Sequence, residues 1–156
     1  MDLPVKRLRP GARLPQRAYP GDAAYDLHAA VDIVIDPLQR VVVPTGIALG
    51  LPSGVAALTL PRSGLAARHG ITIVNAPGLI DPGYRGEIQV ILLNTDRDEP
   101  FAVHSGDRIA QLLLVGLLDA ALIEVAELEA TARGTRGFGS SGTASLPSSE
   151  RHQADP

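Results

Sequence analysis

The strongest constraint on the fold is a series of short apolar runs in which hydrophobic residues recur at every second position. These runs cover residues 31–35, 41–43, 55–57, 71–73 and 88–92. Alternation of this kind predicts strands with one buried face. Turn-forming pairs separate the runs, among them Pro20-Gly21, Asp36-Pro37, Pro52-Ser53, Pro77-Gly78, Pro82-Gly83 and Ser105-Gly106. Their close spacing favours a sandwich, barrel or jelly roll over β-α-β units, so we expect an all-β fold.

Two segments depart from this pattern. The sequence SGLAARHG at 63–70 predicts one short helix that ends at Gly70, whereas the apolar spacing of 117–130 is ambiguous between helix and strand. From Ala132 onward the composition shifts to Gly, Ser, Thr and Arg. We therefore expect a β domain over 1–131, a flexible glycine-rich arm over 132–145 and a disordered tail over 146–156.

Composition restricts the classes of function. A chain of 156 residues with 45 % hydrophobic and 20 % charged residues suits one packed domain. The net charge of −3 offers no basic face for a nucleic acid polymer. No apolar run reaches the roughly 18 residues that a membrane span needs. Because cysteine is absent and MDLPVKRLRP lacks the apolar core of a secretory signal, we expect a cytoplasmic protein without disulfides.

Five separated clusters carry polar residues that a simple β core does not require. They are DAAYDLHAA (22–30), PRSGLA (61–66), GLIDPGYRGE (78–87), GDRIAQ (106–111) and RGTRGFGSSG (133–142). Three of them combine arginine with glycine or serine, which suits phosphate, since a guanidinium matches two phosphate oxygens and small residues let backbone N–H groups approach. Each arginine alone is more often an ordinary surface residue. Their recurrence predicts a ligand with several phosphates.

The Asp-Pro-Gly-Tyr string at 81–84 has a purely structural reading. Asp at the first position, Pro with its fixed φ and Gly make a good turn by their own chemistry. Arg85 and Glu87 follow it, and they can pair with each other or with another subunit. We interpret these two residues as structural support for the hairpin.

In their order and content, the five clusters resemble the five motifs of the trimeric deoxyuridine triphosphate nucleotidohydrolases, the dUTPases. The resemblance runs from about Ala23 to Gly142. It implies a distorted jelly-roll or β-barrel fold of the β-clip type, and a homotrimer whose active sites are shared between subunits. It also implies Mg²⁺-dependent hydrolysis of dUTP to dUMP and diphosphate, which keeps uracil out of DNA and supplies dUMP for thymidylate synthesis.

The resemblance assigns roles in the hairpin. Asp81 matches the carboxylate that orients and deprotonates the attacking water. Tyr84 matches the tyrosine that packs on the deoxyribose and leaves no room for a 2′-hydroxyl. The uracil is implied to bind to the hairpin through main-chain groups and one asparagine, at Asn75, Gly78, Leu79 and Ile80.

The other motifs match the phosphate side of the family site. Asp26 matches a carboxylate that steadies the site, while Asp107 and Arg108 are expected to hold a turn. Phe138 matches the aromatic residue that covers the uracil. The phosphates are implied to bind Arg62, Ser63, Gly64, Gln111, Arg133, Gly139, Ser140 and Ser141, with Mg²⁺ held through phosphate oxygens and waters and by no direct protein ligand.

Three positions depart from the family pattern. Ala24 and Arg136 stand where glycine is usual, and Ser141 stands where threonine is usual. Serine keeps the hydroxyl, but Arg136 adds bulk where a glycine φ is expected. Two other functions stay open for this fold: a deaminase of deoxycytidine triphosphate, and a regulator that binds dUTP without turning it over.

Overall fold

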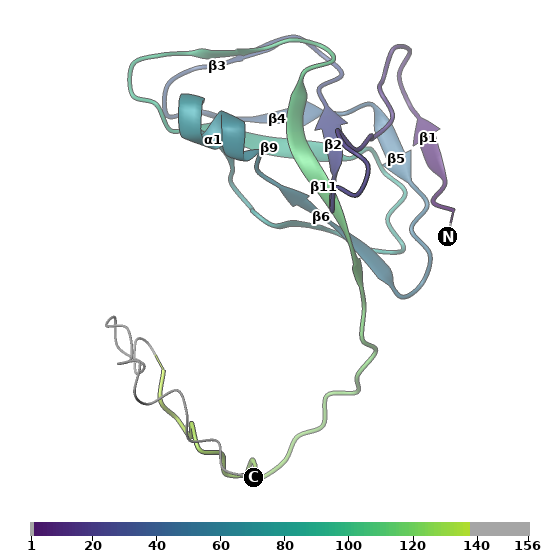
Figure 1. Ribbon diagram of the computed structural model, residues 1–156, viewed down its shortest axis with the longest axis vertical. Helices are drawn as coiled ribbons and strands as arrows, with labels where there is room; N and C mark the ends of the chain where they lie inside the picture. The colour runs from purple at the N-terminus through teal and green to yellow at the C-terminus, as the bar shows by residue number, and fades with distance from the viewer. Residues whose placement is uncertain (1, 138–156) are drawn as a thin grey trace. The chain divides into compact units, whose positions relative to one another are not determined.

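The computed structural model describes residues 2–137 (Figure 1). The chain divides into two units, residues 1–120 and 121–156. All helices and strands of the described part lie in the first unit. They are β1 (Val5–Arg7), β2 (Tyr25–His28), β3 (Ile33–Ile35), β4 (Arg40–Pro44), β5 (Ile47–Leu49), β6 (Val55–Leu60), α1 (Ser63–His69), β7 (Ile71–Ile73), β8 (Gly78–Ile80), β9 (Gln89–Asn94), β10 (Phe101–Val103) and β11 (Arg108–Gly116). The expectation of an all-β fold with one short helix is confirmed.

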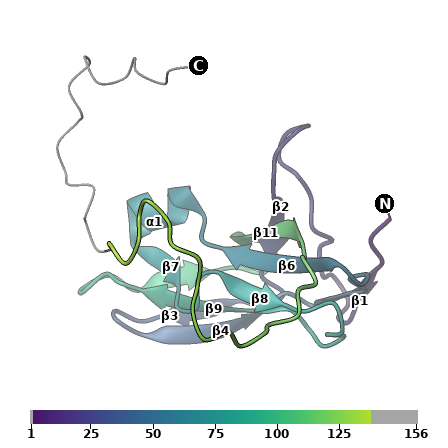
Figure 2. The same ribbon diagram turned by 90° about the horizontal axis from the view of Figure 1, so that it is seen from below.

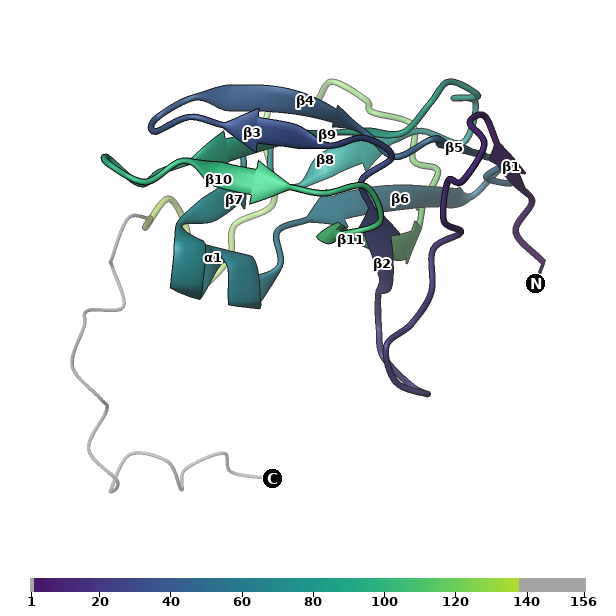
Figure 3. The same cartoon turned by 90° about the horizontal axis from the view of Figure 1, so that it is seen from above.

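The strands form antiparallel sheets throughout. A four-stranded sheet has the order β2-β11-β6-β8, a three-stranded sheet the order β4-β9-β7, and two further pairs join β1 to β5 and β3 to β10. Figures 2 and 3 show β3, β4 and β9 on one side of this unit and β6 and β11 on the other. The result is a layered β structure of the jelly-roll kind.

The core follows the period-two pattern of the sequence. In β9, Val90, Leu92 and Asn94 are buried, while the residues between them are partly exposed, because successive side chains of a strand point to opposite faces. Val43 on β4 and Leu112 on β11 are fully buried in the same cluster. The apolar faces of the two layers therefore meet in one core, which fixes the register of each strand.

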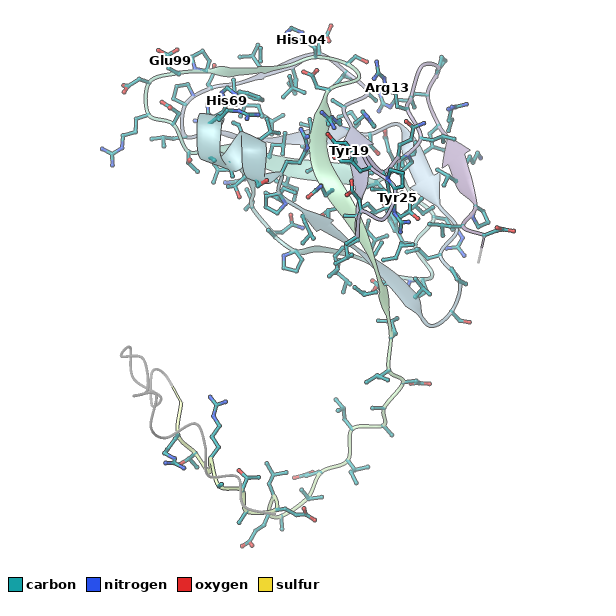
Figure 4. The ribbon with its side chains drawn as sticks, viewed as in Figure 1. Arg13, Tyr19, Tyr25, His69, Glu99 and His104 are labelled. Carbon is teal, nitrogen blue, oxygen red and sulfur yellow. The ribbon has the colours of Figure 1, made fainter. Side chains whose placement is uncertain are left out.

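Helix α1 is the predicted short helix, and it ends where a glycine permits. Gly70 adopts φ +63°, and its N–H donates to the carbonyl of Ala66 at 3.1 Å. A Cβ at this position would lie 2.6 Å from Thr95 Oγ1, so glycine is required by space as well as by φ. The last turn lies beside β10, where the rings of His69 (labelled in Figure 4) and Phe101 are 5.2 Å apart.

Residues 117–130 form neither a helix nor a strand. Neither alternative for its apolar spacing, helix or strand, is therefore formed. Leu118, Leu122 and Leu128 are 88 to 99 % exposed, and a helix of this length is marginal in water unless an apolar face is packed. Within the described residues, no helix is long and apolar enough to span a membrane.

Asn94 is the buried polar residue that ties β9 to its surroundings. Its Nδ2 donates to the carbonyls of Ile35 at 3.1 Å and Glu99 at 2.9 Å, and its Oδ1 accepts from the N–H of Asp96 at 2.9 Å.

Asn94→Ala leaves these groups without partners, so the free energy of unfolding should fall by about 2–4 kcal/mol. Urea denaturation at one fixed protein concentration measures this. The exposed control Asp98→Ala should change it by less than about 0.5 kcal/mol, and equal losses would contradict the assignment.

Candidate active site

A pocket of about 350 Å³ opens beside β8 and the turn that follows it. It brings together every residue that the sequence predicted for the uracil, the deoxyribose and the attacking water, except Phe138. These are Asn75, Gly78, Leu79, Ile80, Asp81 and Tyr84, and the remaining lining comes from Val42, Thr59, Glu87, Ile88, Gln89 and Ile91. The hairpin motif of the sequence is therefore one wall of a single cavity.

The backbone of β8 is available at one edge. Within the described part of the chain, β8 ends the four-stranded sheet, paired with β6 and with no strand on its other side. Some of its N–H and C=O groups therefore point away from β6 and can bind a ligand. Gly78 pairs with Thr59, and a Cβ at this position would collide with the Thr59 hydroxyl and lie 3.1 Å from Asn75 Nδ2. The pocket thus depends on glycine here.

The turn after β8 presents the carboxylate and the aromatic ring together. The N–H of Tyr84 donates to the carbonyl of Asp81 at 3.1 Å, which closes the predicted turn. Asp81 is exposed, so its carboxylate is open to water. Tyr84 is 48 % exposed, and its hydroxyl donates to the carbonyl of Glu87 at 3.0 Å.

A second cluster centres on Asp26, which is only 5 % exposed. Its Oδ1 lies 3.4 Å from Arg62 Nε, and its Oδ2 lies 3.1 Å from Arg108 Nη1. Arg62 also donates to the carbonyl of Arg108 at 3.0 Å. One buried carboxylate therefore holds two guanidinium groups, which compensates its charge and fixes both arginines.

The pairing of three strands places Gln111 in the same cluster. Gln111 on β11 lies opposite Asp26 on β2 and Leu60 on β6. Ser63 and Gly64 begin α1 directly after Arg62, the N-cap residue. The predicted phosphate-side residues of the first, second and fourth motifs are thus brought together, although they are far apart in sequence.

Two residues of the fourth motif have different roles. Asp107 holds the turn as expected, since its Oδ2 accepts from the N–H of His104 at 2.8 Å. Arg108 was also expected to hold that turn, but its side chain instead binds Asp26. The sequence carried no signal for this ion pair, because its partners are 82 positions apart.

The pocket and Asp26 lie at opposite edges of the four-stranded sheet, since β8 and β2 are its two outer strands. Thr59, which lines the pocket, pairs with Leu112, whereas Leu60 pairs with Gln111. Successive side chains of a strand point to opposite faces, so Gln111 faces away from the side that Thr59 lines. Leu79, which also lines the pocket, pairs with Leu58 and is on the face of Gln111, so the pocket at the β8 edge is lined from both faces.

Arg85 and Glu87 do not pair with each other. Arg85 donates to the carbonyls of Pro82 at 2.6 Å and Tyr84 at 2.8 Å, which supports the hairpin as expected. The Glu87 carboxylate accepts from Arg9 instead, with Nε at 3.0 Å and Nη2 at 3.2 Å. Sequence reasoning missed Arg9, which lies 78 positions from its partner.

The fifth motif is described only in part. Arg133 lies in an exposed turn of the second unit, where its Nε donates to the carbonyl of Arg136 at 3.1 Å. Arg136 donates back to Arg133 and Ala132. Among the described residues, Leu38 is the only non-glycine with positive φ, so Arg136 does not adopt a glycine φ in this turn. Four further predicted residues lie outside the described range: Phe138, Gly139, Ser140 and Ser141.

Over residues 2–137, no group of three or more His, Cys, Asp or Glu side chains is placed to hold a metal ion. The carboxylate nearest the phosphate-side residues, Asp26, is already engaged by two guanidinium groups. This donor set fits a Mg²⁺ ion that is carried by phosphate oxygens and waters, which is the usual form of nucleotide-bound Mg²⁺.

His28 lies two residues after Asp26 on β2 and is 8 % exposed, with a buried Nδ1 that has no hydrogen-bond partner among the described residues. Burial lowers the pKa of His28. The guanidinium groups of Arg13 (Figure 4), Arg108 and Arg62 lower it further, against the opposing effect of Asp26. The folded protein therefore holds this imidazole neutral.

This lowered pKa predicts a dependence of stability on pH. In the unfolded chain, His28 has a pKa of about 6.5 and becomes protonated below that pH, whereas in the folded chain it stays neutral to a lower pH. The free energy of unfolding should therefore be highest above about pH 6.5 and fall as the pH drops below it. Urea denaturation between pH 7.5 and 5.5 should show this loss, and His28→Gln should reduce the slope. The control His104→Gln, at a 73 % exposed side chain, should keep it. An unchanged slope in His28→Gln would contradict the assignment.

Comparison with known proteins identifies the family of this chain. The dUTPase family model matches residues 11–142. The deoxyuridine 5′-triphosphate nucleotidohydrolase of Thermobifida fusca is 56 % identical over 138 residues, which cover 88 % of this chain and 77 % of that protein. The enzyme of the same name from Leifsonia xyli is 55 % identical over 142 residues, 91 % of each chain.

Solved structures give the same result. The Staphylococcus bacteriophage 80alpha dUTPase with dUPNHPP is 31 % identical and superposes with a TM-score of 0.86 over 91 % of this chain and 99 % of that chain. A mutant dUTPase from phage phi11 of S. aureus, described with a structural Mg(II) ion, is 26 % identical, with a TM-score of 0.77 over 81 % of this chain and 98 % of that chain. The chain belongs to the dUTPase family.

Proposed function

We propose that this enzyme hydrolyses dUTP to dUMP and diphosphate by attack of a water molecule, held by Asp81, on the α-phosphorus. Hydrolysis of dUTP follows from the family and its close relatives. The observation that carries the proposed mechanism is the pocket itself, where the free edge of β8, Asn75, Tyr84 and Asp81 surround one cavity of about 350 Å³. That is the size range of pockets for small ligands.

The free edge of β8 supports recognition of the base. Uracil presents an acceptor, a donor and an acceptor along its pairing edge, which suits the alternating N–H and C=O groups of a strand edge. Cytosine presents a different order and would leave buried groups unpaired at a cost of several kcal/mol. Gly78 leaves the space that the base requires, and Asn75 adds a side-chain amide at the same wall. This arrangement favours a uracil nucleotide over a deaminase substrate.

The turn at 81–84 supports the proposed contact of Tyr84 with the deoxyribose and of Asp81 with the attacking water. A hydrogen-bonded turn holds Tyr84 close to Asp81. A nucleotide whose deoxyribose packs on the Tyr84 ring would therefore have its α-phosphate near the Asp81 carboxylate. An exposed carboxylate in this position can accept a proton from a water molecule about 3 Å away. The ring of Tyr84 occupies the space that a 2′-hydroxyl would need.

The cluster around Asp26 supports binding of the triphosphate. Arg62 and Arg108 would contact phosphate oxygens with the N–H groups that Asp26 leaves free, while Gln111 and Ser63 would add neutral donors. Mg²⁺ bound to the triphosphate would neutralise charge and favour departure of the diphosphate. The orientation of both arginines depends on Asp26, which acts on the phosphates only through them.

We also propose that each active site combines different subunits of a homotrimer. Within one chain, β6 and β11 separate the pocket beside β8 from Asp26 on β2, which supports a site in which the pocket of one subunit meets the cluster of another. A closed three-fold assembly supplies three such sites. Arg133, Phe138, Gly139, Ser140 and Ser141 would then close over the bound nucleotide.

Asp81→Asn tests the proposed base. The amide keeps the shape but loses the proton acceptor, so kcat for dUTP should fall by about two or more orders of magnitude. Diphosphate release from dUTP, dCTP, dTTP and UTP, with and without Mg²⁺, gives the rates. Calorimetry with dUTP should show that binding is retained. Near-normal turnover would mean that another group activates the water, and ammonia release from dCTP would favour a deaminase instead.

Complementation tests the shared site. Asp81→Asn chains and chains truncated after Thr131 should each be nearly inactive alone. When they are refolded together in equal amounts, roughly a quarter of the sites in randomly mixed trimers contain an intact Asp81 and an intact arm from different chains. Activity should therefore return to about that fraction. Background activity in trimers confirmed as mixed by chromatography would show that the arm serves its own chain, and would leave the dUTPase assignment intact.

A further inference from the structure

The Tyr84 side chain contacts the backbone of residues 86 and 87. Its hydroxyl donates to the carbonyl of Glu87 at 3.0 Å. Its ring rests on Gly86, where an added Cβ would lie 2.6 Å from the ring Cζ. Because the side chain is half exposed, other packing does not restrict it fully. The position of the ring therefore depends on where residues 86 and 87 lie.

The side chain of Glu87 fixes that part of the backbone. Its Oε1 accepts from the N–H of Gly46 at 2.8 Å and from Arg9 Nε at 3.0 Å, and its Oε2 accepts from Arg9 Nη2 at 3.2 Å. The next residue, Ile88, donates to the carbonyl of Ile47 at 2.8 Å. Residues 87 and 88, at the end of the hairpin, are thus attached to the 45–47 segment.

Arg9 is itself anchored. The N–H of Leu8 donates to the carbonyl of Gly46 at 2.8 Å, and Ala12 donates to the carbonyl of Arg9 at 3.3 Å. Arg9 and Glu87 form a two-point pair whose side chains are 46 % and 18 % exposed. A paired geometry of this kind restricts orientation more than a single contact does.

We propose that Arg9 and Glu87 form a brace that holds Tyr84 in the position required to exclude a ribose. The inference rests on the proposed role of Tyr84 in sorting the sugar. Exclusion of one hydroxyl depends on the position of the ring to within a fraction of an ångström, and a side chain held that closely needs a fixed support. Arg9 is therefore a positioning residue for substrate specificity, although it does not line the pocket.

The primary measurement is the ratio of kcat/KM for UTP to kcat/KM for dUTP. Arg9→Ala should raise this ratio about fivefold, the effect expected when one partly exposed ion pair is lost, with kcat for dUTP nearly unchanged. Arg9→Lys keeps the charge but cannot bind both oxygens of Glu87 in the same way, so it should give an intermediate ratio. Glu87→Gln, which keeps an oxygen for the Gly46 N–H, should also raise it. The exposed control Arg97→Ala should leave it unchanged.

The same substitution in a Tyr84→Ala background shows whether Arg9 acts through Tyr84. Tyr84→Ala alone should raise the ratio further than Arg9→Ala does, and adding Arg9→Ala should then have no further effect. Independent, additive effects would overturn the brace, as would an unchanged ratio in Arg9→Ala while Tyr84→Ala raises it. Both results would leave the proposed function standing. If Tyr84→Ala itself does not change the ratio, the proposed sugar-sorting role fails, and the brace fails with it.

Discussion

The rest of the structure depends on the pairing of β11 with strands on both of its edges. Because β2 and β6 flank β11, Asp26, Gln111 and Leu60 form one row across three strands. The same pairing leaves β8 at the outside of the sheet with a free edge. This pairing therefore assembles the cluster around Asp26, whereas the pocket beside β8 depends on the pairing of β8 with β6. A shift of β11 by one residue would turn Gln111 to the other face and away from Asp26.

Charge is organised around this row by a single buried carboxylate. Asp26 would be costly to bury alone, and Arg62 and Arg108 would repel each other without it. Together the three groups carry one net positive charge, which suits the several negative charges of the proposed triphosphate ligand. His28 is kept neutral beside them by burial and by the same arginines. The proposed binding of phosphates and the pH dependence of stability therefore involve the same charged groups.

Residue patterns in the sequence were enough to predict the elements that are stabilised by contacts between near neighbours. The turn at Asp81 and Tyr84 and the helix that ends at Gly70 follow from the residues that form them, because each is stabilised by hydrogen bonds to near neighbours. The segment 117–130 shows the limit, since apolar spacing does not form a helix without a surface to pack on. The pairs Arg108 with Asp26 and Arg9 with Glu87 show another limit, because nothing in a single sequence links residues about 80 positions apart.

By itself, the sequence determined the all-β class, the short helix and the hairpin that carries Asp81, and its motifs indicated the family. Only the tertiary structure decided which side chains share a space. It placed Gln111 with Asp26, directed Arg108 to the same carboxylate, and set the pocket of Asp81 and Tyr84 beside β8, at the opposite edge of the sheet from β2. The physical reason is that strand alternation is encoded within a few residues, whereas register and strand order depend on pairing between segments that are distant in the chain.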